Sequence, residues 1–144
     1  MKITVKNFQK QTKVVSVPVK KAVNAALSAL GLHSPAGQIS IYFVGDKMIK
    51  ALNSRYLGHN RATDVLAFDV RRAPNDGLLA DIVISVDTAK RNARIFSTSL
   101  SHELCLYAVH GILHLSGYDD KTAAQRKRMQ KKSETILKAV LPDE

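Results

Sequence analysis

The sequence predicts an α/β (α+β) fold with a four-stranded, mixed but mostly parallel sheet and about five helices. The first indication is the order of the segments, because strand-like and helix-like stretches follow one another as β-α-β-α-β-β-α-α-α. The second is size, since 144 residues are typical of one domain, here taken as 1–144. The third is a hydrophobic content of 45%, which is enough for an ordinary core.

The first segments alternate between the two types. KITVKN, residues 2–7, alternates apolar and polar side chains as a half-buried strand does. Pro18 suits the first turn of a helix over 19–31, which should stop at Gly31. The β-branched and aromatic run ISIYFV, residues 39–44, predicts the second strand.

The middle of the chain predicts a helix and then two strands. The helix covers 45–58, with Asp46 as its expected cap and Gly58 as its terminator. DVLAFDV, residues 64–70, and ADIVISV, residues 80–86, follow as strands. One strand of the four is expected to run against the others.

The connection between these two strands, RRAPNDGL, contains Pro74 and an Asn-Asp-Gly turn signal at 75–77. A helix is predicted to start at Asp87 and cover 87–96. Both assignments depend on local signals alone.

The last part of the chain predicts two more helices. The longer one is apolar and covers 99–117, with Ser99 or Ser101 near its start. Gly117 suits the left-handed position just after its end. The final helix covers about 121–138 and has a basic outer face.

The chain is strongly basic. It has 22 Lys and Arg against 12 Asp and Glu, a net charge of +10, and its pI is near 9.9. Basic residues gather over 1–21 and 121–138, where Glu134 is the only acidic residue. We expect contact with nucleic-acid phosphates, the alternative being a soluble surface without a binding role. Few aromatic residues lie among the basic ones, so the sequence indicates no platform for base stacking.

Other features exclude several classes of protein. The sequence has no run of about 18 apolar residues, which argues against a membrane span. The opening stretch MKITVKNFQK lacks the apolar region of a signal peptide. A single cysteine, Cys105, excludes an internal disulfide and a multi-cysteine zinc site. We therefore expect a cytoplasmic protein with no membrane partner.

The stretch HGILHLSGYDD carries the strongest chemical signal. His110 and His114 are four residues apart, so on a helix both imidazoles can point at one metal ion. A sharp turn at Gly117 would bring Asp119 or Asp120 back toward them. Two nitrogens and one carboxylate oxygen leave the fourth position of a zinc site open for a catalytic water.

The residue between the histidines argues against a peptidase. Gly111 stands where HExxH zinc proteases have the glutamate that serves as general base. Glycine cannot take a proton, so hydrolysis would depend on the acidity of the metal-bound water and on charge stabilisation. Glu103 lies about two helical turns before His110. It either balances the helix dipole or supports a metal ligand from behind.

HGILHLSGYDD resembles the signature of the YbeY endoribonuclease family, His-Gly-x-Leu-His-Leu-x-Gly-Tyr-Asp-His. TDVLAF, residues 63–68, is similar to the family's Thr-Asp-Val-Leu-Ser-Phe, and ADIVIS, residues 80–85, to its Gly-Asp-Ile-Val-Ile-Ser. The order of the segments agrees too, so the resemblance covers nearly the whole chain.

The resemblance implies a single-strand-specific, metal-dependent endoribonuclease that acts in 16S rRNA 3′-end maturation and ribosome quality control. It implies one metal ion per chain, Zn²⁺ or another divalent metal, held by His110, His114 and Asp120. Asp119 would then fix the turn through backbone hydrogen bonds. The implied partners are single-stranded RNA, ribosomal RNA and the small ribosomal subunit.

The chain departs from the family pattern at two positions that bear on the chemistry. Asp120 stands where the family has a histidine ligand, and aspartate also ligates zinc. Leu57 stands where the family has an arginine thought to stabilise phosphate charge. Arg55 and Arg61 are the candidates for that role.

Two function classes remain open at this point. One is the endoribonuclease, and the other is an RNA- or ribosome-binding assembly factor whose metal site is mainly structural. In both cases RNA should contact the basic face of the last helix, at Arg126, Lys127, Arg128, Lys131 and Lys132.

Overall fold

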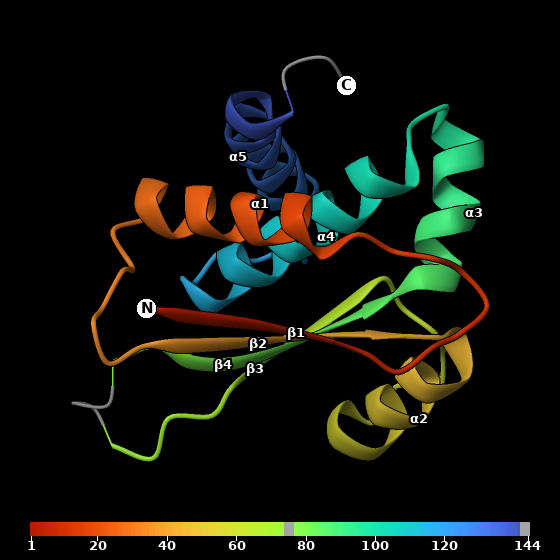
Figure 1. Cartoon of the computed structure of the whole chain (residues 1–144), viewed down its shortest axis with the longest axis horizontal. Coiled ribbons are helices and arrows are strands. Elements are labelled where there is room, and N and C mark those ends of the chain that lie inside the picture. Colours follow the sequence, from red (N-terminus) through yellow and green to blue (C-terminus); the bar gives the residue numbers. More distant parts are fainter. Residues whose placement is uncertain (74–76, 142–144) are drawn as a thin grey trace.

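The computed structural model describes residues 1–73 and 77–141, and the order of elements is the predicted one (Figure 1). The elements are β1 Lys2–Asn7, α1 Ser16–Ala29, β2 Gln38–Val44, α2 Asp46–Leu57, β3 Val65–Asp69, β4 Leu79–Ser85, α3 Val86–Phe96, α4 Leu100–Leu115 and α5 Ala123–Val140. Pro74 and the first two residues of the turn predicted at 75–77 lie outside the described residues.

The sheet confirms the predicted mixed, mostly parallel arrangement. Its strand order is β1-β2-β4-β3. β1 and β4 both run parallel to β2, with Val5 opposite Ile41 and Ile41 opposite Ile82. β3 is the reversed strand and pairs with β4 at the edge, where Phe68 lies opposite Asp81.

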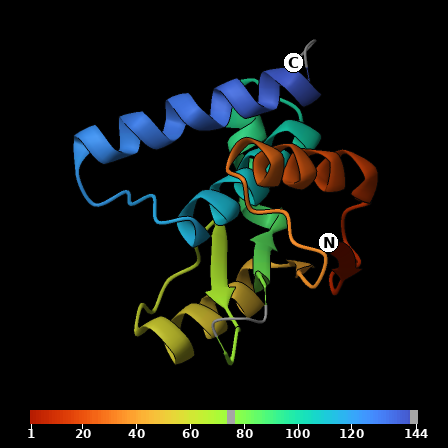
Figure 2. The same ribbon diagram turned by 90° about the vertical axis from the view of Figure 1, so that its left-hand side faces the viewer.

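Most of the helices cover one face of the sheet. α1 and α4 pack on that face, α5 lies on α1 and α4, and α2 alone lies on the opposite face (Figures 1 and 2). Strand side chains alternate between the faces. Ile41 and Ile82 therefore point into the main core with the helices, whereas Tyr42 and Val83 point toward α2.

Two predicted helix starts were displaced. α1 begins at Ser16, so Pro18 is its third residue, still within the first turn where an N–H has no intrahelical partner. The prediction of Asp46 as the cap of α2 was wrong, because Gly45 is the N-cap and no side chain of the described residues makes a capping hydrogen bond there. The Asp46 carboxylate is instead bound by residues of β4 and α3, described below.

The other helix ends follow ordinary capping chemistry. Ser99, one of the two residues considered, is the N-cap of α4, and its hydroxyl accepts a hydrogen bond from the His102 N–H. Gly117 has φ +104, which confirms its left-handed position after the helix. Thr122 and Gln125 form a capping box at the start of α5. These ends fix the loop that contains both aspartates.

Candidate functional site

α4 places His110 and His114 one turn apart at its C-terminal end. Gly111, between them, lies against β4, since an added Cβ would stand 3.1 Å from Ile82 Cγ2. Any larger residue would push α4 away from the sheet or displace Ile82. Close packing of α4 on β4 therefore explains why a glycine stands between the two histidines.

The loop after α4 turns back toward the histidines. The Gly117 N–H donates to the His114 carbonyl at 3.1 Å, and the Tyr118 N–H donates to Leu113 at 3.0 Å. The chain then brings Asp120 Oδ2 to 3.6 Å from His114 Nε2. Asp119 accepts the Asp120 N–H at 2.8 Å, so its carboxylate is engaged within the turn.

Arg126 contributes to this loop in a way the sequence did not indicate. Its Nη1 donates to the carbonyl of Asp120 at 3.2 Å and to that of Lys121 at 3.3 Å. One of the five predicted RNA contacts is therefore also a residue that holds the segment carrying Asp120.

His110 has the burial and the protonation state expected of a metal ligand. Its Nε2 is buried and has no hydrogen-bond partner within the described part of the chain. Burial lowers the pKa of His110, and the neighbouring His114 lowers it further, while the Asp64 and Asp120 carboxylates act in the opposite direction. The balance favours neutral imidazole, which is the form that binds a metal ion.

Asp64 was missed as a site residue. Its carboxylate acts electrostatically on His110, and its Oδ1 accepts hydrogen bonds from the Val65 N–H at 2.8 Å and the Thr63 hydroxyl at 3.3 Å. The sequence signal for Asp64 is its place in TDVLAF, residues 63–68, one of the motifs that carry the family resemblance. Sequence spacing could not show that the start of β3 faces α4.

The donor set fits a metal ion. His114 and Asp120 are separated by 3.6 Å, too far for a good hydrogen bond but close to the roughly 3.3 Å expected between two ligands of a tetrahedral zinc. The unpartnered His110 nitrogen supplies the third donor. Over the described ranges, however, no three His, Cys, Asp or Glu side chains already converge closely enough to define a metal site.

Glu103 belongs to a buried polar group between α3 and α4. Thr98 Oγ1 donates to its Oε2 at 2.9 Å, and Tyr107 Oη lies 3.4 Å from its Oε1. Asn92 donates to the Tyr107 hydroxyl at 2.7 Å, and burial raises the pKa of Tyr107. Glu103 is 3% exposed in the first turn of α4, so it is not a solvated carboxylate that only balances the helix dipole.

The two candidate arginines lie at the end of α2 and in the loop behind it. Arg55 is exposed, and its guanidinium carbon is 5.4 Å from the centroid of the Tyr56 ring. Arg61 is exposed too, while its carbonyl accepts a hydrogen bond from Asn53 at 3.1 Å. This loop leads along the chain to Asp64, whose carboxylate acts to raise the pKa of His110 against the effect of burial.

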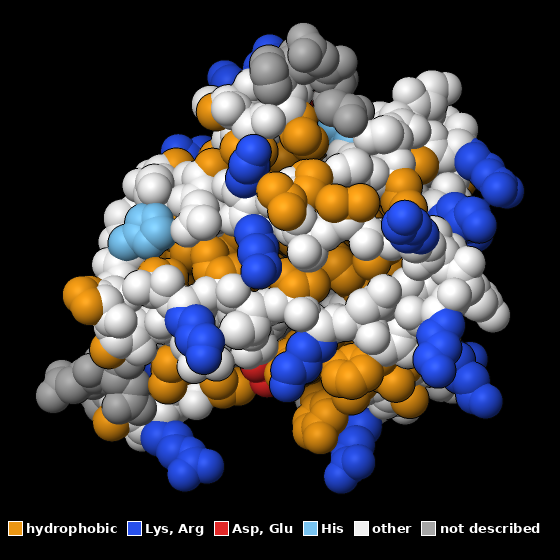
Figure 3. All heavy atoms as spheres, in the orientation of Figure 1, with side chains coloured by type: hydrophobic (Ala, Val, Ile, Leu, Met, Phe, Trp, Pro, Cys, Tyr) orange, Lys and Arg blue, Asp and Glu red, His pale blue; other side chains and the backbone are white. Residues whose placement is uncertain are grey.

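The surface is basic over much of the molecule. Figure 3 shows Lys and Arg spread over one face, and among the residues that the structure describes almost no acidic side chain is visible on it. On α5, Lys127, Arg128 and Lys131 are exposed and Lys132 is half-buried. Arg128 also lines a hollow of about 320 Å³ with Gly117 and the residues that follow it. The basic helix is therefore continuous with the loop that carries Asp119 and Asp120.

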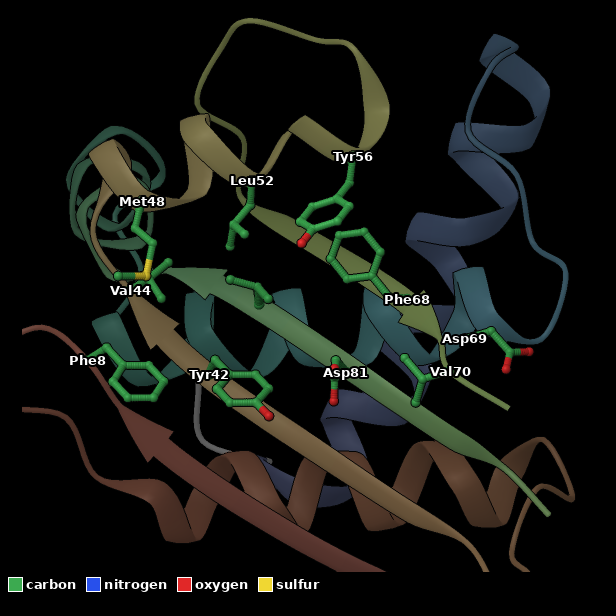
Figure 4. Close-up of a pocket in the computed structure, with 11 residues that line it drawn as sticks. Phe8, Tyr42, Val44, Met48, Leu52, Tyr56, Phe68, Asp69, Val70 and Asp81 are labelled. Atoms are coloured by element: carbon green, nitrogen blue, oxygen red, sulfur yellow. The ribbon is translucent and has the colours of Figure 1, made fainter. Parts of the chain in front are cut away.

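A second hollow of about 550 Å³ lies on the α2 side of the sheet (Figure 4). We call it the α2 groove. Burial raises the pKa of Asp81 on its floor, and Asp69 at its edge is paired with Arg71. Its lining consists of Phe8, Tyr42, Val44, Met48, Leu52, Tyr56, Phe68, Asp69, Val70, Asp81 and Val83.

Comparison with known proteins gives a consistent result. The family model described as endoribonuclease YbeY matches residues 3–141. A protein named endoribonuclease YbeY from Desulforamulus reducens is 36% identical over 95% of this chain and 95% of its own length. One from Anaeromyxobacter sp. (strain Fw109-5) is 45% identical over 80% of this chain, but the match spans only 59% of that relative.

The fold also has a counterpart among solved structures. The solution structure of TM1509 from Thermotoga maritima matches 98% of this chain and 90% of its own, with a TM-score of 0.62 and 25% identity. Within the described residues, no helix has the length and apolar character needed to cross a membrane.

Proposed function

This chain belongs to the endoribonuclease YbeY family, and from that premise we propose that it is a single-strand-specific, metal-dependent endoribonuclease of the cytoplasm. We propose 16S rRNA 3′-end maturation and ribosome quality control as its setting, with ribosomal RNA and the small ribosomal subunit as partners. The observation that carries the proposal is the buried His110 Nε2, which has no hydrogen-bond partner among residues 1–73 and 77–141 and lies one turn from His114, itself 3.6 Å from Asp120.

The cofactor we propose is one divalent metal ion per chain, Zn²⁺ by the chemistry of the donors, held by His110, His114 and Asp120. When bound, the metal supplies a Lewis acid and lowers the pKa of water. The chain provides the rest: α4 and Gly111 position the two imidazoles, and the turn held by Asp119 and Arg126 presents Asp120.

The reaction also needs positive charge beside the scissile phosphate, because charge accumulates on the phosphoryl oxygens as the bond breaks. Leu57 cannot provide it. Arg55 and Arg61 are exposed in the segment that precedes Asp64 in the chain, and α5 adds a basic surface next to the loop of Asp120. We propose that the RNA backbone follows these two surfaces past the histidines.

Single-turnover cleavage tests the proposal. Purified protein is mixed with a labelled single-stranded RNA, with the same RNA annealed to its complement, and with each after treatment with a chelator. The expected result is cleavage of the single strand alone, lost on chelation and restored by Zn²⁺ or another divalent ion. Equal cleavage with and without chelator would refute metal dependence, and no cleavage under any condition would refute the enzyme.

The second candidate function is an RNA- or ribosome-binding assembly factor with a structural metal site. One observation favours it, namely that Leu57 occupies the position of the family arginine. In that case chelation would lower the melting temperature, and RNA would bind without being cut. Measuring binding and cleavage on the same samples separates the two functions.

A further inference from the structure

Tyr56 is an aromatic side chain held at the surface instead of in the core. α2 carries Met48, Leu52 and Tyr56 at intervals of four residues, so all three lie over the α2 groove (Figure 4). Tyr56 closes this row at the C-terminal end of the helix and is 58% exposed. Nothing in the packing of the main core requires an exposed ring at this point.

The ring is nevertheless fixed in place. Phe68 of β3 contacts it edge to face, with centroids 5.9 Å apart and an interplanar angle of 67°. Arg55 lies over it at 5.4 Å. The helix end beneath it is closed by Gly58 at φ +72, whose N–H donates to Ser54 at 3.2 Å. A ring backed by a second ring and carried on a helix is preorganised for a planar ligand.

β3 connects the ring to α4, because Phe68 of this strand contacts Tyr56 and the strand also packs against α4. Asp64, which acts on His110, immediately precedes β3. Phe68 lies four residues further along the chain, about 13 Å at about 3.3 Å per residue. Arg61 lies between Tyr56 and Asp64 in the sequence and is exposed, so the loop that joins the ring to Asp64 carries a positive charge.

We propose that Tyr56, backed by Phe68 and flanked by Arg55, is a stacking platform for one unpaired nucleobase of the bound RNA. The inference rests on the proposed function and adds a base-binding subsite to it. Bases of single-stranded RNA commonly stack on exposed aromatic rings and arginine planes. The Asp81 carboxylate on the groove floor repels phosphate, so the base enters the groove while the backbone stays beside Arg55.

The platform also gives a physical reason for a preference for single strands. A base can lie on Tyr56 only if it has left its own stack and its pairing partner. In a duplex that step costs a few kcal/mol, whereas in a single strand it costs least. Discrimination would then arise at the binding step, before any bond is broken.

The test is RNA binding in the presence of chelator, so that no cleavage occurs. Anisotropy of a labelled single-stranded oligonucleotide is measured with Tyr56→Ala, Tyr56→Phe and the matched control Phe96→Ala, which removes another exposed ring, 64% exposed at the end of α3. We expect Tyr56→Ala to bind about five- to a hundredfold more weakly, the range for one lost base stack. Tyr56→Phe and Phe96→Ala should bind as the wild type does.

Two further measurements distinguish stacking from charge. Tyr56→Ala should keep the slope of log affinity against log salt, because a lost stack releases no counterions, whereas Arg55→Ala should reduce it. In the wild type, a single abasic site moved along the oligonucleotide should weaken binding most at one position. Tyr56→Ala should be insensitive at that position.

Several outcomes would overturn the platform. It fails if Tyr56→Ala binds RNA as tightly as the wild type, the result expected if the α2 groove serves a protein partner. It also fails if the abasic penalty is the same in Tyr56→Ala and wild type. A wild-type protein that binds RNA with the abasic pattern but never cleaves it would refute the proposed enzyme and leave the platform standing. A wild type that binds no RNA would refute both.

Discussion

At the scale of single residues, the chemistry depends on how His110 is surrounded. Its Nε2 is buried and finds no hydrogen-bond partner in the part of the chain that the structure describes, and burial favours the neutral ring. Asp64 opposes this effect, because a carboxylate stabilises the protonated imidazole. Burial outweighs the carboxylate, so the pKa of His110 is lowered and the neutral ring, the form that can bind a metal ion, is favoured.

Removing the Asp64 charge should therefore lower the pKa of His110 further. In metal-free protein, NMR titration of the imidazole should show a pKa below 6.5 for the wild type and a lower one for Asp64→Asn, since the charge that raises it is gone. Asp69→Asn is the control, because its carboxylate is paired with Arg71 and is not among the groups that shift the pKa of His110. An unchanged or higher pKa in Asp64→Asn would show that the Asp64 carboxylate does not face His110.

The missing family arginine leads to a second prediction at this scale. If Arg55 or Arg61 stabilises the phosphate in the transition state, its replacement by alanine should slow single-turnover cleavage by one to a few powers of ten, about 2–4 kcal/mol as for a lost charge-stabilising donor. Leu57→Arg should raise the rate. If both alanine variants keep the wild-type rate, neither arginine has taken the role.

At the scale of elements, two helix starts are tied together by one carboxylate. Asp46, the first residue of α2, accepts hydrogen bonds from Ser85 at 2.6 Å and Thr88 at 2.8 Å, and Arg91 of α3 donates to it at 2.6 Å. In return, Asp87 of α3 accepts the Asp46 N–H at 2.8 Å. This exchange locks α2 to β4 and α3, and so holds the helix that carries Arg55 and Tyr56.

The stability of this junction should depend on pH. Burial alone would raise the pKa of Asp46, but hydrogen bonds from Ser85, Arg91 and Thr88 outweigh it and hold the pKa below 3.8. A lowered carboxyl pKa contributes stability above the unfolded value near 3.9, which is lost as pH falls through the folded pKa.

Asp46→Asn should therefore lower the free energy of unfolding by about 1–3 kcal/mol at pH 7, the cost of removing a charged hydrogen-bond acceptor. The difference from wild type should shrink below about pH 4. Urea denaturation at several pH values measures it, with the more exposed Asp69→Asn as a control expected to cost less. A difference that is constant from pH 7 to pH 3 would contradict the account.

The sequence predicted the type and order of these elements more accurately than the residues at which they begin and end. Periodicity and glycine signals were sufficient for the order of nine segments, because each depends on a few neighbouring residues. The start of α1 and the cap of α2 were misplaced. Asp46 shows the reason: it looks like a local cap, yet Ser85 and Arg91, about forty residues away, bind its carboxylate.

In the candidate site, too, residues close together in the sequence were predictable and contacts between distant segments were not. His110, His114 and the turn at Gly117 were predictable because they lie within one short stretch. Asp64 was not, since it reaches His110 only through the packing of β3 against α4. The sequence indicates no stacking platform, because few aromatic residues lie among the basic ones along the chain. Tyr56 and Phe68 are twelve residues apart and come into contact only through the packing of α2 on the sheet.

At the scale of the whole molecule, the net charge of +10 should make RNA binding strongly dependent on salt. Replacing Lys127, Arg128, Lys131 and Lys132 of α5 by alanine should reduce the log–log salt slope by up to about 3, at about 0.7 per phosphate contact on a single strand. Affinity should fall with little change in melting temperature, because these side chains are largely exposed. A flat salt plot for the wild type would remove phosphate contact from the account.

At the centre of the molecule's chemistry we propose one metal ion held by two histidines of α4 and one aspartate of the following turn. The most direct test measures bound metal by mass spectrometry, and RNA cleavage on the same samples, for wild type, Asp120→Ala and the matched neighbour Asp119→Ala. We expect one metal ion per chain in the wild type, loss of most metal and activity in Asp120→Ala, and retention of metal in Asp119→Ala. Stoichiometric metal in Asp120→Ala together with its loss in Asp119→Ala would contradict the assignment.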